Sequence, residues 1–209
     1  MLRRRLLLLL AAAPAACASP NPVLYVLAPL PGTSLPGTSL TGPSLMSVPG
    51  PGAPRSGGPQ SGAPATVELR EIGLARYLER SQIVRSSEGY RLDVLSNEWW
   101  GEPLGAMLSR VLVQELTQRL PGSTVFAESG AITISPAATV AVNIQRLDAD
   151  ATGAAVLIAQ VEVSGRMAAT RNIHLTVPPT AAATAGLVEA MSQAIAQLAD
   201  TIAAMLRGE

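Results

Sequence analysis

The sequence predicts an α+β domain, a two-layer sandwich in which two helices cover a mostly antiparallel sheet. Three successive runs of alternating apolar and polar residues lie between positions 140 and 177, a pattern typical of an antiparallel meander with one apolar face. Two other segments, one in the middle of the chain and one at its end, repeat apolar residues at helical spacing. The apolar face of the meander is the surface on which these helical stripes can be buried.

The chain begins with a segment typical of bacterial export signals. Arginines at positions 3–5 precede an unbroken apolar run that ends at Ala13, and two alanines lie directly before Cys17, the only cysteine. We expect residues 1–16 to be removed and acyl chains to be attached to Cys17. One alternative is cleavage at an Ala-x-Ala-like site, which leaves a secreted protein with a free thiol. The other is an uncleaved anchor, although a transmembrane helix needs about 20 apolar residues.

A stretch rich in Pro, Gly, Ser and Thr extends from Ala28 to Pro64 and contains a five-residue direct repeat at 31–40. Such a composition buries too little apolar surface to offset its ordering entropy. We interpret residues 17–65 either as a lipid-attached tether or as a loop inserted after a first strand at 23–27. Residues 66–209 are long enough to form one domain with its own core.

Short elements are expected before the first helix: a strand at 67–72, a helical turn at 75–80, and strands at 82–85 and 90–95 around a turn at 86–89. Glu102 and Pro103 favour a helix start, because proline suits the first turn and a carboxylate suits the helix dipole. Apolar residues then recur at helical spacing from Leu104 to Leu116, and the Pro-Gly pair at 121–122 ends the helix.

The second half of the domain is expected to form three strands and a long helix. The strands lie at 140–144, 157–164 and 167–177, with turns at 148–153 and 165–166. The final helix runs from Ala182 to Arg207. Its apolar stripe should cover the meander and consists of Leu187, Met191, Ile195, Leu198, Ile202 and Met205.

The composition argues against several classes of function. All 15 basic residues are arginines, they balance 15 acidic residues, and they form no basic stripe, so a nucleic-acid partner is not expected. The sequence has no nucleophile elbow, phosphate-binding loop, dinucleotide fingerprint or zinc-ligand spacing. His174, the only histidine, lies on the mixed face of a predicted strand. We found no grouping among five carboxylates and predict no catalytic residues, cofactor or metal; the five are Glu71, Glu79, Asp93, Glu98 and Glu102.

An ordered set of short motifs lies between Glu68 and Leu120. Residues 77–80 read Tyr-Leu-Glu-Arg, residues 82–84 read Gln-Ile-Val, and residues 100–104 read Trp-Gly-Glu-Pro-Leu. A Tyr-Val-Leu triplet at 25–27 follows the cysteine. In this order the motifs resemble the PqiC-type auxiliary lipoproteins of ABC transport systems, also called the membrane-integrity-associated transporter subunit family.

The resemblance implies a lipoprotein on the periplasmic face of the outer membrane. Such proteins work with an inner-membrane ABC permease and ATPase and with an MCE-domain protein that move lipids between the membranes. The family brings no catalytic residues, since another subunit hydrolyses ATP. Two other functions stay open: a periplasmic carrier, which needs an apolar cavity of roughly several hundred Å³, and a structural envelope lipoprotein without a transport role.

Three residues are candidates for partner binding, because aromatic and arginine side chains dominate interface energies. Tyr77 and Arg80 lie in the predicted helical turn, and Trp99 precedes the first helix. The alternative interpretation places Tyr77 at the edge of the core and leaves Trp99 partly exposed, while Trp100 packs under the helix start. The final helix is also a candidate surface for a homo-oligomer.

Overall fold

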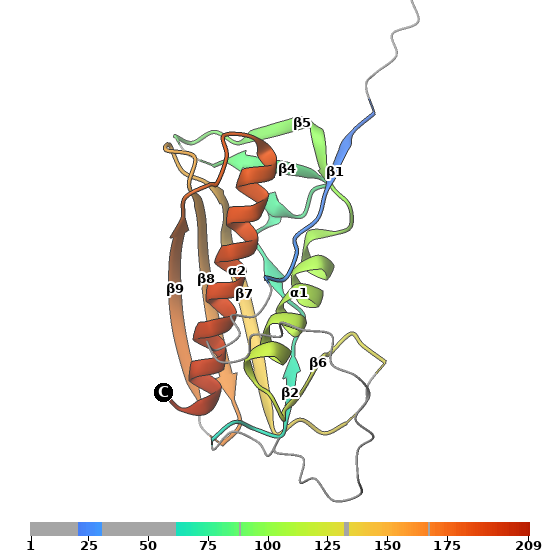
Figure 1. The fold of residues 1–209 in the computed structure, drawn as a ribbon, viewed down its shortest axis with the longest axis vertical. Coiled ribbons are helices and arrows are strands. Elements are labelled where there is room, and N and C mark those ends of the chain that lie inside the picture. The colour runs from blue at the N-terminus through green and yellow to red at the C-terminus, as the bar shows by residue number, and fades with distance from the viewer. Residues whose placement is uncertain (1–20, 31–61, 88, 132–133, 167) are drawn as a thin grey trace, which may run out of the picture.

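The structure is a computed structural model that describes residues 21–30, 62–87, 89–131, 134–166 and 168–209. The predicted signal, Cys17 and the repeat at 31–40 lie outside the described residues. In the part that is described, nine strands form one sheet, and helices α1 (Leu104–Arg119) and α2 (Thr184–Arg207) pack on one of its faces (Figure 1). The predicted α+β class is therefore confirmed.

The predicted antiparallel meander is confirmed as β7 (Ala138–Ala149), β8 (Ala155–Ser164) and β9 (Ala169–Val177). Burial alternates along residues 138–144 of β7 and 157–163 of β8, where the opposite face is more exposed, and Ile173 and Val177 of β9 are buried while His174 is exposed. This alternation is the burial pattern that the sequence periodicity predicted. Residues 147–149 and 155–157 are buried without interruption, and residues 169–172 are exposed.

The other edge of β7 pairs with three short strands in turn, all parallel to it. These are β2 (Thr66–Leu69), β3 (Gly73–Leu74) and β4 (Gln82–Ser86), with the 3-10 turn η1 (Arg76–Leu78) between the last two. Strand β6 (Thr124–Ala127) runs parallel to β2 on its far side. The sheet is thus mixed, and sequence analysis missed both β3 and β6, which are too short to show a period.

Strand β5 (Asp93–Trp100) pairs antiparallel with β4, and β1 (Val23–Tyr25) runs parallel to β5. We predicted a strand at 90–95, which was placed too early: Tyr90 adopts a left-handed φ of 60°, and the strand begins only at Asp93. It then continues through both tryptophans. Trp100 is 7% exposed, which confirms its predicted place in the core.

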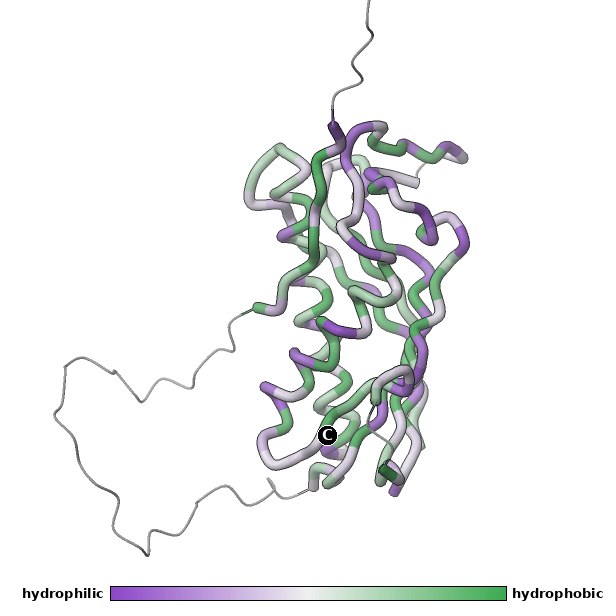
Figure 2. The backbone as a smooth tube through the Cα atoms, turned by 90° about the vertical axis from the view of Figure 1, so that its right-hand side faces the viewer, coloured by the Kyte–Doolittle hydropathy of each residue, from purple (hydrophilic) through white to green (hydrophobic). Residues whose placement is uncertain are grey.

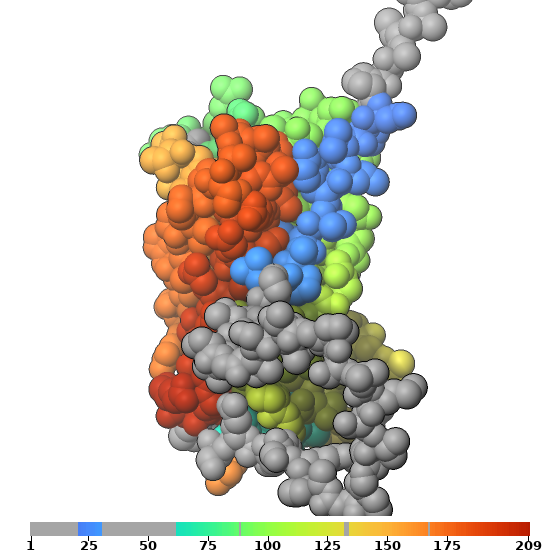
Figure 3. Space-filling view, viewed as in Figure 1, coloured from blue at the N-terminus to red at the C-terminus, as the bar shows by residue number. Residues whose placement is uncertain are grey.

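The segment after β1 lies between the two helices (Figure 3). Leu27 is 1% exposed, and its backbone N–H donates to Met107 Sδ at 3.1 Å. The N–H of Ala28 donates to Ser192 Oγ at 3.3 Å, and that of Leu30 to Glu115 Oε1 at 2.6 Å. Residues 21–30 therefore contribute to the sheet and the core, alongside the predicted domain at 66–209.

Candidate functional site

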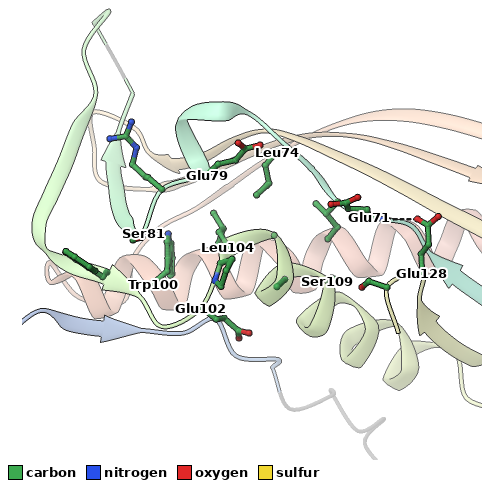
Figure 4. A pocket seen from close by; sticks show the side chains of 16 residues that line it. Glu71, Leu74, Glu79, Ser81, Trp100, Glu102, Leu104, Ser109 and Glu128 are labelled. Atoms are coloured by element: carbon green, nitrogen blue, oxygen red, sulfur yellow. Dashed lines mark hydrogen bonds between the residues drawn. The ribbon is translucent and has the colours of Figure 1, made fainter. Parts of the chain in front are cut away.

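An open groove of about 940 Å³ lies between the η1 region and the start of α1 (Figure 4). The η1 side contributes residues from Glu71 to Ser81, the end of β5 contributes both tryptophans, and α1 contributes its first turns. Glu128 and Ser129, just after β6, close the far end. Leu74 and Leu104 point toward one another across the groove, and Ile72 and Trp100 complete its apolar floor.

Carboxylates surround this apolar floor. Glu71, Glu79, Glu102 and Glu128 all line the groove, together with the single cation Arg80 among its described lining residues. Of the five carboxylates for which we expected no grouping, Glu71, Glu79 and Glu102 line this groove, whereas Asp93 and Glu98 lie elsewhere on β5. The lining residues that are described include no histidine, so no serine there has an imidazole base.

Pairing between β2 and β6 explains why Glu71 and Glu128 meet. The two strands run parallel and in register, so the residues that follow them lie side by side. The N–H of Glu128 donates to the Leu69 carbonyl at 2.8 Å, and the N–H of Glu71 donates to Glu128 Oε2 at 3.1 Å. This contact joins residues that are 57 positions apart, and no local sequence pattern reports it.

Two of the three predicted partner-binding residues meet in this groove. Arg80 and Trp99 both line it, and the hydrogen bond from Trp100 N–H to the Ser81 carbonyl, 2.7 Å long, ties their two segments together. Arg80 Nε donates to the Tyr77 carbonyl at 2.9 Å, and the exposed guanidinium has no other described partner. Trp99 is half-buried, and its indole N–H donates to the Ser96 carbonyl at 3.2 Å.

Tyr77 is directed away from the groove and toward β7. Its hydroxyl donates to Asp148 Oδ2 at 3.1 Å, and Asp148, which is fully buried, also accepts from Arg146 Nε at 2.7 Å. Burial raises the pKa of Tyr77 to about 12, and the nearby Asp148 carboxylate adds to this effect. The structure thus separates Tyr77 from the pair formed by Arg80 and Trp99.

Two further observations concern the part of the chain that the structure describes. Neither α1 nor α2 combines the length and hydropathy that a membrane-crossing helix needs. No three side chains among its described His, Cys, Asp and Glu residues lie close enough together to hold a metal ion.

The family comparison assigns this fold to an auxiliary transport lipoprotein. The chain belongs to the family described as "ABC-type transport auxiliary lipoprotein component", whose model matches residues 46–203. The match includes the motif segment at 68–120, so the PqiC-type resemblance is confirmed. The family is one of auxiliary transport components and not a known enzyme family.

Solved structures share the fold. One is a crystal structure of an uncharacterized protein, with a TM-score of 0.61 and 20% identity, covering 67% of this chain and 90% of that chain. Another is protein XCC0632 from Xanthomonas campestris, assigned to DUF330, with a TM-score of 0.57 and 19% identity, covering 72% of this chain and 91% of that one. No curated protein matched the chain.

Proposed function

We propose that this protein is the non-enzymatic, outer-membrane lipoprotein subunit of an ABC/MCE-type system that moves lipids between membranes and maintains the envelope. Family membership, which gives a transport-associated lipoprotein role, is the observation that carries the proposal. In this proposal an MCE-domain protein binds the groove, and the inner-membrane permease and ATPase supply the energy.

The chemistry of the groove supports a docking role. A carrier would need an enclosed apolar cavity, because an acyl chain gains its affinity from burial away from water. The groove instead surrounds its apolar floor with carboxylates and is open to solvent. Such a surface suits a protein segment that carries apolar residues, with cations facing the glutamates and an acceptor group facing Arg80. Arg80 and Trp99 are the proposed contacts, while Tyr77 supports the turn on which Arg80 lies.

Membrane attachment is tested at Cys17. We expect wild-type protein to carry acyl mass and to fractionate with the outer membrane, because each buried acyl CH₂ contributes about 0.8 kcal/mol and two chains make attachment stable. Cys17→Ser should abolish both. A Cys17→Ser protein that stays with membranes, combined with wild type that lacks acyl mass, would refute the lipoprotein assignment.

Partner binding is tested with the purified protein and the MCE-domain protein encoded beside it. Arg80→Ala and Trp99→Ala should each weaken the complex by more than about 1 kcal/mol. Arg76→Ala is the matched control, because Arg76 is also exposed, four residues before Arg80, but does not line the groove. Tyr77→Phe should leave the affinity unchanged.

A further variant separates loss of binding from loss of folding. Ala106 is exposed on α1 and lines the groove, so Ala106→Gln adds bulk there without removing a core contact. It should weaken the complex while the melting temperature stays within a few degrees. If the groove variants all bind as wild type, the groove is not the docking site. If folded wild type does not bind at all, a structural lipoprotein becomes the better explanation.

A further inference from the structure

Exposed apolar side chains gather at one end of the molecule. Among the described residues, six large hydrophobic side chains are exposed, and five of them belong to β1, its next residue and the β4–β5 hairpin: Val23, Leu24, Val26, Tyr90 and Leu92. Leu24 is 62% exposed, and Tyr90 at the hairpin tip is fully exposed. The sixth, Ile134, lies between β6 and β7.

Strand β5 joins the two groups: Tyr90 and Leu92 precede its first residue, and β1 pairs with its last residues, with Leu24 opposite Trp99. Strand β5 crosses the top of the molecule in Figure 1, and the described chain enters the fold at that same end. Figure 2 shows a hydrophobic run directly after this entry point. Apolar residues of β1 and of the hairpin tip thus lie at the same end of the molecule, at opposite ends of β5.

Chain length limits what can lie against this end. Only four peptide units separate Cys17 from Asn21, and they span at most about 14 Å. An acyl group on Cys17 therefore holds the start of β1 at the bilayer surface. The opposite end of the molecule, where α2 ends at Arg207, points away from it (Figure 1).

The hairpin sequence is neutral overall, since Glu88 and Asp93 balance Arg85 and Arg91, but Arg91 is placed to contact lipid phosphates. Arg91 is exposed between Tyr90 and Leu92, so its guanidinium can reach phosphate groups while the neighbouring side chains contact acyl carbon. Tyrosine is itself favoured at such interfaces, where the ring is apolar and the hydroxyl stays wet. The adjacent Asp93 is already paired with Arg85, whose Nε lies 2.7 Å from its carboxylate. In the neighbouring β7–β8 turn, Asp150 accepts hydrogen bonds from Thr152 and Ala154.

We infer that this end of the protein rests on the lipid surface, with Tyr90 and Leu92 in the headgroup region at one end of β5 and Val23 and Leu24 at the other. The inference rests on the acylation of Cys17 proposed above. It adds a second membrane contact to the anchor, and together the two set the orientation of the molecule, with its long axis upright on the membrane.

The test uses the acylated full chain, with its acyl mass verified, in vesicles of phosphatidylethanolamine and phosphatidylglycerol. The vesicles contain lipids brominated near the headgroup end of the chain. Tyr90→Trp places a fluorescent reporter at the hairpin tip, and Leu92→Trp gives a second one. Gln118→Trp is the matched control, exposed near the far end of α1. The emission of the two native tryptophans is subtracted.

We expect bromine to reduce the emission of the reporters at 90 and 92 about twofold, because both side chains enter the interface, and to leave position 118 unchanged. Equal quenching at 90, 92 and 118 would overturn the inference while leaving the acyl attachment intact. The inference would also be overturned if brominated lipid does not quench the reporters at 90 and 92 but binding of the MCE-domain protein shields them from solvent, since a protein then covers this end. A chain without acyl mass would overturn both the attachment and the inference.

Discussion

Single residues show where buried charge is balanced in this fold. Asp148 and Glu115 are both fully buried, and each is paired with an arginine that is itself partly covered, Arg146 and Arg119 respectively. A buried carboxylate that loses its partner is costly, because neither water nor another donor replaces it. These two sites therefore give direct tests of the structure at the residue scale.

Tyr77→Phe removes the hydroxyl that donates to Asp148 and should lower the free energy of unfolding by about 1 kcal/mol near neutral pH. The native pKa of about 12 exceeds the ordinary value of 10.0, so folding favours the protonated phenol. The stabilisation that the protonated Tyr77 hydroxyl provides is complete below pH 10 and is lost as the pH rises toward 12. Urea unfolding at several pH values should therefore show the difference between wild type and variant shrinking above pH 10.

The control for this prediction is Tyr90→Phe, which alters a fully exposed hydroxyl and should change stability by less than about 0.5 kcal/mol. A difference between wild type and Tyr77→Phe that persists undiminished at high pH would contradict the Tyr77–Asp148 interaction.

Glu115→Gln tests the charge between the two helices. Although burial lowers the pKa of Arg119, hydrogen bonds to Asp200 and Glu115 raise it above its ordinary value, so Arg119 stays charged. The glutamine can still accept from the Leu30 N–H but leaves Arg119 without its buried partner, so we expect a loss of about 1–3 kcal/mol in unfolding free energy. Asp200→Asn should cost less than about 1 kcal/mol, because that carboxylate is 64% exposed. If chemical denaturation shows equal losses of unfolding free energy for Glu115→Gln and Asp200→Asn, the prediction is wrong.

At the scale of elements, the N-terminal segment is part of the core. Leu27 fills the space between α1 and α2, and three backbone N–H groups around it find partners on these helices. Leu27→Ala should therefore lower the unfolding free energy by about 2–4 kcal/mol through lost burial and a residual cavity. Val26→Ala, at a side chain that is 57% exposed, should change it by less than about 0.5 kcal/mol. Thermal and urea unfolding of both variants would check this, and similar effects would count against the packing of this segment.

At the scale of the whole molecule, residues 31–61 connect two points that both lie on the fold, Leu30 and Gly62. Deletion of 31–40 leaves 21 connecting residues, which still span up to about 70 Å. Loop closure depends only weakly on length, so stability should change by less than about 0.5 kcal/mol. A large drop in melting temperature would mean that the repeat makes contacts that its composition does not indicate.

Sequence reasoning succeeded for elements whose pattern is long. The meander and both helices span enough residues for their periods to be read, and the boundaries of α2 differ from the prediction by two residues at its start. It failed for β3 and β6, which have two and four residues, and for β5, where the left-handed turn at Tyr90 shifts the strand. These elements depend on pairing partners that lie far away in the chain.

The groove, too, could be predicted from the sequence only in part. Arg80 and Trp99 were chosen as single residues of a type common at interfaces, and the structure places them on one surface. That Glu71, Glu79, Glu102 and Glu128 line one groove was not predicted. The contact between Glu71 and Glu128, for example, depends on the parallel pairing of β2 with β6. No spacing in the sequence encodes such a contact.

The fold class, the two helices, the meander and the family can be read from the chain alone, because periodicity and ordered motifs are local properties. Three features appear only after folding: the hydrogen bond from Tyr77 to Asp148, the position of Leu27 between the helices, and the acidic groove beside α1. Each of them joins segments distant in sequence, and its energy comes from burial and hydrogen bonding that exist only once the chain has folded.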